Sequence, residues 1–199
     1  LIPTPHIDRL AAEGTRFTHA YSECPICIPA RRTWMTGQTP AHQGVTFNYH
    51  TRLEGPTLPG VLADHGYQSH LAGKLHLWPE RKLYGFHSMD LADGPGTQGK
   101  LATNDHARDL ARRGIFLDDA GRAHGMTGNT WNARPWHLPE DLHPTAWCVS
   151  KAIDFLERRD PTLPFFLNVG IFHPHPPCTP PEHYFQRFLD RDLPDPVEA

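Results

Sequence analysis

A cysteine and an arginine four residues apart, Cys27 and Arg31, are the first residues whose types and spacing could do chemistry. Pro29 between them favours the first turn of a helix, which would place Cys27 at the helix N-terminus and Arg31 on the same face. Backbone N–H groups and the helix dipole at that end favour an anion or a thiolate, and a planar guanidinium suits a tetrahedral oxyanion. The pair predicts an anion pocket with a nucleophile. A buried structural cysteine before a proline-started helix is the alternative.

Cys24 and Cys27 also form a Cys-x-x-Cys pair, which is typical of a redox centre or of half a zinc site. The other two of the 4 cysteines, Cys148 and Cys178, form no second pair of this spacing. The sequence therefore argues against a structural zinc site, and 4 cysteines are too few for a disulfide scaffold of this size. A Cys24/Cys27 redox module remains an open interpretation.

A lysine and a histidine two residues apart, Lys74 and His76, lie in a stretch that reads as a strand over residues 67–77. Side chains two apart in a strand share a face, so a fixed cation and a proton carrier would project together. Such a pair could neutralise an oxyanion and protonate a leaving alkoxide. A solvated strand edge is the alternative.

The elements that must position these residues alternate between helices and strands. The sequence predicts helices over residues 5–13, 29–35, 58–65 and 145–158, and strands over residues 16–21, 67–77 and 164–171. The last strand is nearly continuously apolar, which is typical of burial on both faces. Apolar positions of the first and third helices are expected to face inward; these are Ile7, Leu10, Ala11, Leu58, Val61 and Leu62.

This alternation predicts an α/β fold with a mostly parallel sheet covered by helices. Residues 90–100 and 118–144 are expected to be long loops, since they are rich in Gly, Pro, His and Trp without periodicity. The apolar run at 164–171 ends in a proline-rich segment containing His173 and His175. Open parallel sheets bind ligands at the carboxyl ends of their strands, so these histidines are site candidates.

Composition narrows the classes of partner. A net charge of -3 gives no basic field for nucleic acid, and no apolar run approaches the length of a membrane span. The 15 histidines are compatible with acid–base or metal chemistry near neutral pH. The sequence opens on Leu1 instead of methionine, so we expect its natural start upstream, and both a cytoplasmic and an exported protein stay open.

Three of these segments together resemble the sulfatase family of the alkaline-phosphatase superfamily. They are Cys27-x-Pro29-x-Arg31 followed by Met35-Thr36-Gly37, then Gly73-Lys74-x-His76-Leu77, and then His173-Pro174-His175-Pro176. The segment at residues 4–11 looks like the one that precedes the cysteine motif in sulfatases. The resemblance implies an alkaline-phosphatase-like three-layer sandwich, here truncated at both ends.

The resemblance also implies the chemistry. A maturation enzyme would oxidise Cys27 to formylglycine, whose hydrate is the nucleophile that attacks a small-molecule sulfate ester. The implied catalytic residues are Cys27, Arg31, Lys74, His76 and His175, and the implied substrate-binding residues are Asn48 and His173. Asn48 could equally be a turn residue.

Sulfatases also hold a divalent metal, here expected to be Ca²⁺, partly through consecutive acidic residues that precede the segment at 4–11. The only Asp-Asp pair of this chain is Asp118-Asp119, whose loop context does not match. The resemblance therefore implies that residues 1–199 are a single partial catalytic domain. Of the metal ligands it would hold only the modified Cys27, and it would be inactive alone.

Two other interpretations share the same residues. A phosphonate monoester or phosphodiester hydrolase of the superfamily can carry the same Cys-x-Pro-Ala-Arg motif, although Lys74 with His76 favours sulfate. A relative without activity that only binds an anion is the non-enzymatic rival, and three intact motifs argue against it.

Overall fold

The computed structural model describes residues 2–93, 104–117, 125–126, 130–192 and 195. A parallel three-stranded sheet lies at the centre, with the strand order β2-β1-β3. Its strands are β1 (Gln68–Gly73), β2 (Ser88–Leu91) and β3 (Phe165–Gly170). Gly73 of β1 pairs with Leu91 of β2 and with Gly170 of β3, so the carboxyl ends of the three strands are level.

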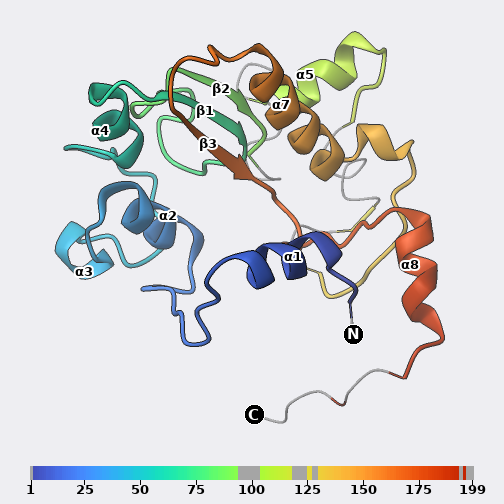
Figure 1. The fold of residues 1–199 in the computed structure, drawn as a ribbon. Helices are drawn as coiled ribbons and strands as arrows, with labels where there is room; N and C mark the ends of the chain where they lie inside the picture. Colours follow the sequence, from blue (N-terminus) through green and yellow to red (C-terminus); the bar gives the residue numbers. More distant parts are fainter. Residues whose placement is uncertain (1, 94–103, 118–124, 127–129, 193–194, 196–199) are drawn as a thin grey trace.

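Helices cover both faces of this sheet (Figure 1). Alternate residues of β1 face opposite sides: Leu71 belongs to one buried cluster with Met35 of α2 (Cys27–Thr36), and Ala72 belongs to another with Trp147 of α7 (Pro144–Arg158). Two faces covered by helices make a three-layer arrangement, which confirms the predicted α/β class with a parallel sheet.

The remaining elements lie around this centre. They are α1 (Pro5–Glu13), α3 (Pro40–Gln43), α4 (Leu58–Asp64), α5 (Asp105–Arg112), the 3-10 helix η2 (Glu140–Leu142) and α8 (Glu182–Leu189). No described helix is long and apolar enough to cross a membrane.

Four predictions about elements are wrong in whole or in part. Residues 16–21 form no strand, and Phe17 and Tyr21 are exposed, because no described strand pairs with them. The strand predicted over residues 67–77 ends at Gly73, where a positive φ of 105° turns the chain. The expected loop at 90–100 includes the end of β2, and η2 lies inside the loop expected at 118–144; residues 94–103 and 118–124 lie outside the described part.

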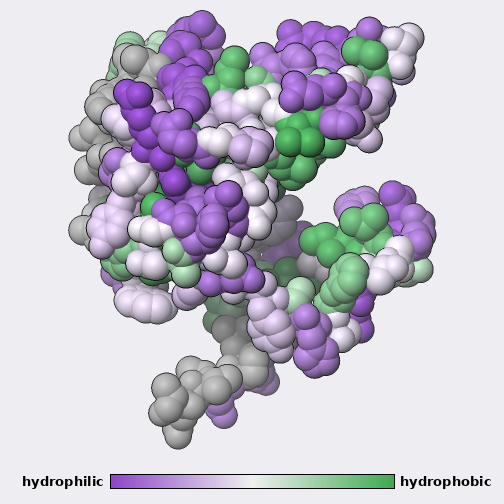
Figure 2. Space-filling model, turned by 90° about the vertical axis from the view of Figure 1, so that its left-hand side faces the viewer, coloured by the Kyte–Doolittle hydropathy of each residue, from purple (hydrophilic) through white to green (hydrophobic). Residues whose placement is uncertain are grey.

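Several side chains that were expected to face inward are exposed. Among them are Ile7, Leu10, Leu58 and Val61 of α1 and α4, and Phe165 and Val169 of β3. Val149, Ile153 and Leu156 of α7 are exposed as well. In the described sheet β3 pairs only with β1, so it is an edge strand and is not buried on both faces. Figure 2 shows hydrophobic residues on both sides of a notch in the surface.

Candidate active site

Cys27 is the first residue of α2, as the proline two positions later predicts. The side-chain oxygen of Asn48 accepts a hydrogen bond of 2.9 Å from the N–H of Ile28, so it satisfies one donor of the helix start. Asn48 therefore lies beside Cys27, and the bond it makes in the described structure is to the backbone. At the other end, Gly37 stops α2 in the left-handed conformation with φ of 70°.

Two arginines of α2 hold the helix in place. Arg32, which is buried, donates from Nε to Gln43 at 2.9 Å and from a terminal nitrogen to the carbonyls of Thr51 and Arg52, both at 3.2 Å. Arg31 donates to the carbonyl oxygen of Lys74 at 3.0 Å, which ties α2 to the chain leaving β1. Burial lowers the pKa of Arg31, while Asp93 and Cys27 act in the opposite direction.

Two glycines allow the backbone at this point to pack closely. The N–H of Lys74 donates to the carbonyl of Gly170 at 2.7 Å. A Cβ on Gly170 would lie 2.3 Å from the Lys74 oxygen, and a Cβ on Gly73 would lie 2.3 Å from the Gly170 oxygen. Only glycine fits at either position, so the ends of β1 and β3 fix Lys74.

Lys74 is buried, with 4% of its surface exposed. Its ammonium group lies 4.7 Å from the ring centroid of Phe172, close enough for a cation–π contact. Burial lowers the pKa of Lys74, as does Arg31, while Cys27 and Asp93 raise it. Cys27, Arg31 and Lys74 are therefore near enough to act on one another electrostatically.

His76 lies close to this group, but the backbone conformation that places it there is a turn and not the predicted strand. It follows β1 in a turn with a φ of 56°, so it shares no strand face with Lys74. Burial lowers its pKa to about 4, and Lys74, Arg31, His50 and His175 add to the effect. Its Nδ1 is buried and has no hydrogen-bond partner in the described residues. At neutral pH the ring is uncharged and lies among positive groups.

Asp93 is a site residue that the sequence analysis did not identify. It lies two residues beyond β2, and its Oδ1 accepts hydrogen bonds from the N–H groups of Leu75 at 2.6 Å and His76 at 2.8 Å. Burial raises its pKa, and the two N–H bonds, Arg31 and Lys74 partly offset this. The expectation that carboxyl ends of parallel strands meet could have indicated it.

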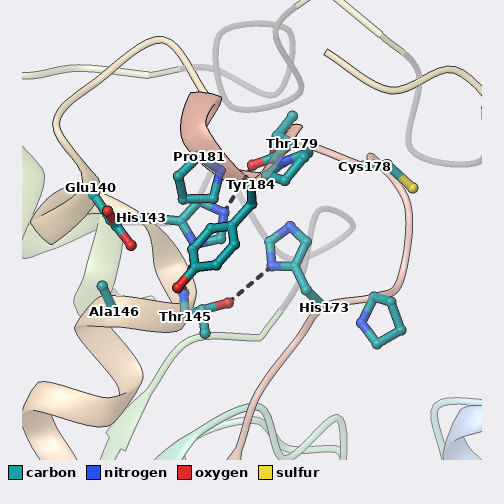
Figure 3. A pocket seen from close by; sticks show the side chains of 11 residues that line it. Glu140, His143, Thr145, Ala146, His173, Cys178, Thr179, Pro181 and Tyr184 are labelled. Atoms are coloured by element: carbon teal, nitrogen blue, oxygen red, sulfur yellow. Dashed lines mark hydrogen bonds between the residues drawn. The ribbon is translucent and has the colours of Figure 1, made fainter. Parts of the chain in front are cut away.

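The two histidines after β3 lie in different surroundings. His175 contacts the ring of Phe172 with a centroid separation of 4.8 Å and is near enough to His76 to influence its pKa. His173 instead lines a cavity of about 510 Å³ between α7 and α8, together with His143 and Tyr184 (Figure 3). Its Nδ1 is 3.4 Å from the hydroxyl of Thr145, and burial, the main cause, lowers its pKa to about 4.

The structure thus brings together Cys27, Arg31, Lys74, His76 and His175, leaves Asn48 beside the start of α2, and places His173 in the neighbouring cavity.

All 4 cysteines are free thiols, so Cys24 and Cys27 form no disulfide. The described residues contain no group of three or more His, Cys, Asp or Glu side chains that could hold a metal ion, and Asp118 and Asp119 lie outside them. Two cations beside a helix N-terminus are groups whose chemistry suits an anion.

Known proteins have sequences and a fold similar to those of this chain. A sequence model named Sulfatase matches residues 1–194. The chain is 37% identical over 216 residues to an arylsulfatase of Clostridium perfringens, covering 98% of this chain and 43% of that protein. It is 29% identical over 198 residues to an N-acetylglucosamine-6-O-sulfatase of Bacteroides thetaiotaomicron, covering 99% and 31%. The solved phosphonate monoester hydrolase of Agrobacterium radiobacter superposes with a TM-score of 0.77 at 24% identity, covering 100% of this chain and 41% of that one, and shows the same alkaline-phosphatase-like fold.

Proposed function

The chain belongs to the Sulfatase family, and on that premise we propose that it hydrolyses sulfate monoesters through a formylglycine made from Cys27. The observation that carries the proposal is the grouping of Cys27, at the first position of α2, with the half-buried Arg31 and the buried Lys74. A helix N-terminus and two cations suit the oxygens of one sulfate group.

The proposed reaction has two steps. A hydroxyl of the hydrated formylglycine attacks the sulfur and gives up its proton, and the S–O bond to the alcohol breaks as the alcohol oxygen takes up a proton. The second hydroxyl then loses its proton to solvent, the C–O bond to sulfate breaks, and the aldehyde forms again. A water molecule adds to the aldehyde and restores the hydrate for the next turnover. Arg31 and Lys74 balance the negative charge of the sulfate oxygens in both steps.

His76 and His175 are proposed to handle the proton and the sulfate geometry. The pKa of His76 lies at about 4 among its positive neighbours, and a bound anion would raise it by offsetting Lys74 and Arg31. Substrate binding would thereby prepare His76 to donate a proton. Asn48 would hold the start of α2 and contact substrate, and His173, from the adjacent cavity, would contact the alcohol side.

The family generally uses formylglycine and a divalent metal, which polarises the sulfate group. We propose that Ca²⁺ is that metal, that its ligands other than the modified Cys27 come from sequence outside residues 1–199, and that a maturation enzyme modifies Cys27. The chain spans 43% of the Clostridium perfringens relative, which is consistent with a partial catalytic domain. Exposed apolar side chains such as Ile153 and Val169 would then be covered by the rest of the domain.

Turnover of paired substrates tests the proposal. The protein, expressed with any flanking sequence its gene encodes and with a maturation enzyme, is assayed on an aryl sulfate, an aryl phosphodiester and a phosphonate monoester. We expect the highest kcat/KM on the sulfate, loss of activity in Cys27→Ala, and retained activity in the control Cys24→Ala. Preference for a phosphorus ester would favour the phosphonate or phosphodiester hydrolase, and an activity lost equally in Cys24→Ala would favour the redox module.

A further inference from the structure

We propose that Asp93 is a positioning residue: its buried carboxylate fixes the backbone turn that places Lys74 and His76 in the anion site. The inference rests on the proposed function, because the side chains it concerns are those assigned to the sulfate group. Asp93 itself lies behind the turn and is not proposed to touch substrate.

The hydrogen bonds of Asp93 define the turn. One oxygen, Oδ1, accepts from two consecutive N–H groups, those of Leu75 at 2.6 Å and His76 at 2.8 Å. These are the residues directly after Lys74. Consecutive N–H groups converge on one acceptor only when the chain curls around it, so the carboxylate selects a tight turn over continuation of β1.

The conformation of His76 shows why such a support is needed. Its φ of 56° lies in the left-handed region, which a residue with a Cβ seldom adopts unless its surroundings impose it. The same turn presents the carbonyl of Lys74 to the guanidinium of Arg31 at 3.0 Å. If the turn relaxed into an extended chain, both the His76 ring and the contact between Arg31 and Lys74 would move.

Asp93 is itself held firmly. It is 2% exposed, and the preceding N–H, that of Ala92, donates to the carbonyl of Gly73 at 3.0 Å. The carbonyl of Asp93 accepts from the side chain of Asn104 at 3.2 Å, and Asn104 also caps α5 through the N–H of Ala107. The backbone that carries the Asp93 carboxylate is thus anchored to β1 on one side and to the start of α5 on the other.

The negative charge of Asp93 also stabilises the positions of Arg31 and Lys74. Arg31 and Lys74 both interact with it electrostatically, although neither forms the two hydrogen bonds that define the turn. A buried anion behind two neighbouring cations reduces their mutual repulsion while the sulfate site is empty. The Asp93 carboxylate therefore supports the cations both through the backbone and through its field.

Two substitutions of Asp93 and one control test the inference in the active, full-length protein. Asp93→Asn keeps an oxygen that accepts both N–H bonds, whereas Asp93→Ala removes it. The control Leu91→Ala removes a fully buried side chain near the end of β2 and leaves both bonds intact. We expect Asp93→Ala to lower kcat about 100-fold and to weaken binding of inorganic sulfate about tenfold, because misplacement by about 1 Å has effects of this size.

For Asp93→Asn we expect kcat and the affinity for inorganic sulfate to stay within about tenfold of wild type. Leu91→Ala is expected to lower the melting temperature, with little loss of kcat at temperatures where the variant is still folded. Equal losses in Asp93→Asn and Asp93→Ala would overturn positioning by hydrogen bonds, as would an Asp93→Ala enzyme no worse than Leu91→Ala. A wild-type protein that binds sulfate without hydrolysing sulfate esters would refute the proposed function alone, since sulfate affinity still reports on Asp93.

Discussion

Lys74 is buried although it carries an ammonium group, and the reason lies in its neighbours. Burial and Arg31 lower its pKa, while Cys27 and Asp93 raise it. Two cations held together away from water repel each other, and an anion bound between them relieves that repulsion. This charge distribution supports the proposal that the ligand is an anion.

Arg31→Lys tests whether the guanidinium shape matters beyond its charge. Lysine keeps the charge but lacks the planar fork, which donates to the Lys74 carbonyl and would donate to a sulfate oxygen from another nitrogen. We expect kcat/KM for an aryl sulfate to fall by about 100-fold to 1,000-fold, the usual effect of losing one donor to a developing oxyanion. The matched control is Arg16→Lys at an exposed position, and equal activity of the two variants would contradict the role of Arg31.

The sequence identified some of these residues and missed others for a physical reason. Cys27 and Arg31 lie four residues apart in one helix, so their spacing alone predicts that they share a face. Asp93 and Phe172 reach the site through pairing between β1, β2 and β3, and a single aspartate or phenylalanine after a strand carries no local pattern. Lys74 and His76 were identified correctly as neighbours, but by a strand geometry that the chain does not adopt.

At the scale of the elements, the close contact between β1 and β3 is what places Lys74. Gly170→Ala would put a Cβ 2.3 Å from the Lys74 oxygen and 2.8 Å from its nitrogen, so the strands must separate. We expect a loss of about 1–3 kcal/mol in the free energy of unfolding, as for other overpacked sites, together with reduced kcat/KM. Urea unfolding and aryl sulfate turnover measure both.

Val169→Ala is the control for this change, because it alters a half-exposed side chain of the same strand. It should leave turnover nearly unchanged. A Gly170→Ala protein with wild-type stability and activity would show that the glycine contact does not position Lys74.

The start of α2 depends on the amide of Asn48. Asn48→Ala removes the acceptor for the N–H of Ile28, and we expect about 1 kcal/mol of lost stability, typical of a lost N-terminal cap, and a lower kcat because Cys27 is the adjacent residue. Thr39→Ala removes the comparable cap of α3, where Thr39 accepts from His42 at 3.2 Å. If both variants lose stability alike and neither loses activity, Asn48 has only a structural role.

Elements with strong periodicity or clear caps were predicted well, namely α1, α2, α4, α7 and β3. Others were not recognised, namely α3, β2, α5, η2 and α8. For β2 and α5 the reason is that their stabilising contacts are distant in sequence. β2 has four residues. α5 buries Asp105 and His106 as well as Ala107 and Leu110. Asp105 accepts from the N–H of Leu91 at 2.7 Å, and a ring nitrogen of His106 lies 2.9 Å from the Leu142 carbonyl oxygen.

For the whole molecule, burial of neutral histidines should make stability depend on pH. His173 has a pKa of about 4 in the folded chain, below the value of about 6.5 expected when unfolded. The unfolded chain therefore binds protons first as the pH falls from 7 to 4, and folding loses stability over that range. We expect wild type to lose roughly 3 kcal/mol more than His173→Asn by pH 4, from the difference between those pKa values.

Chemical denaturation of both proteins at several pH values measures this difference. Subtracting the two curves removes the contributions of other titrating groups, including Asp93, whose raised pKa has the opposite effect. Parallel curves for the two proteins would contradict the burial of a neutral His173.

The central claim, that Cys27 at the start of α2 becomes the nucleophile, is tested most directly by the mass of the peptide that contains it. The peptide is taken from protein produced with a maturation enzyme and shown to hydrolyse an aryl sulfate. We predict that it carries an aldehyde in place of the thiol, in proportion to the activity of each preparation. An active preparation whose Cys27 peptide retains only the thiol would contradict the account.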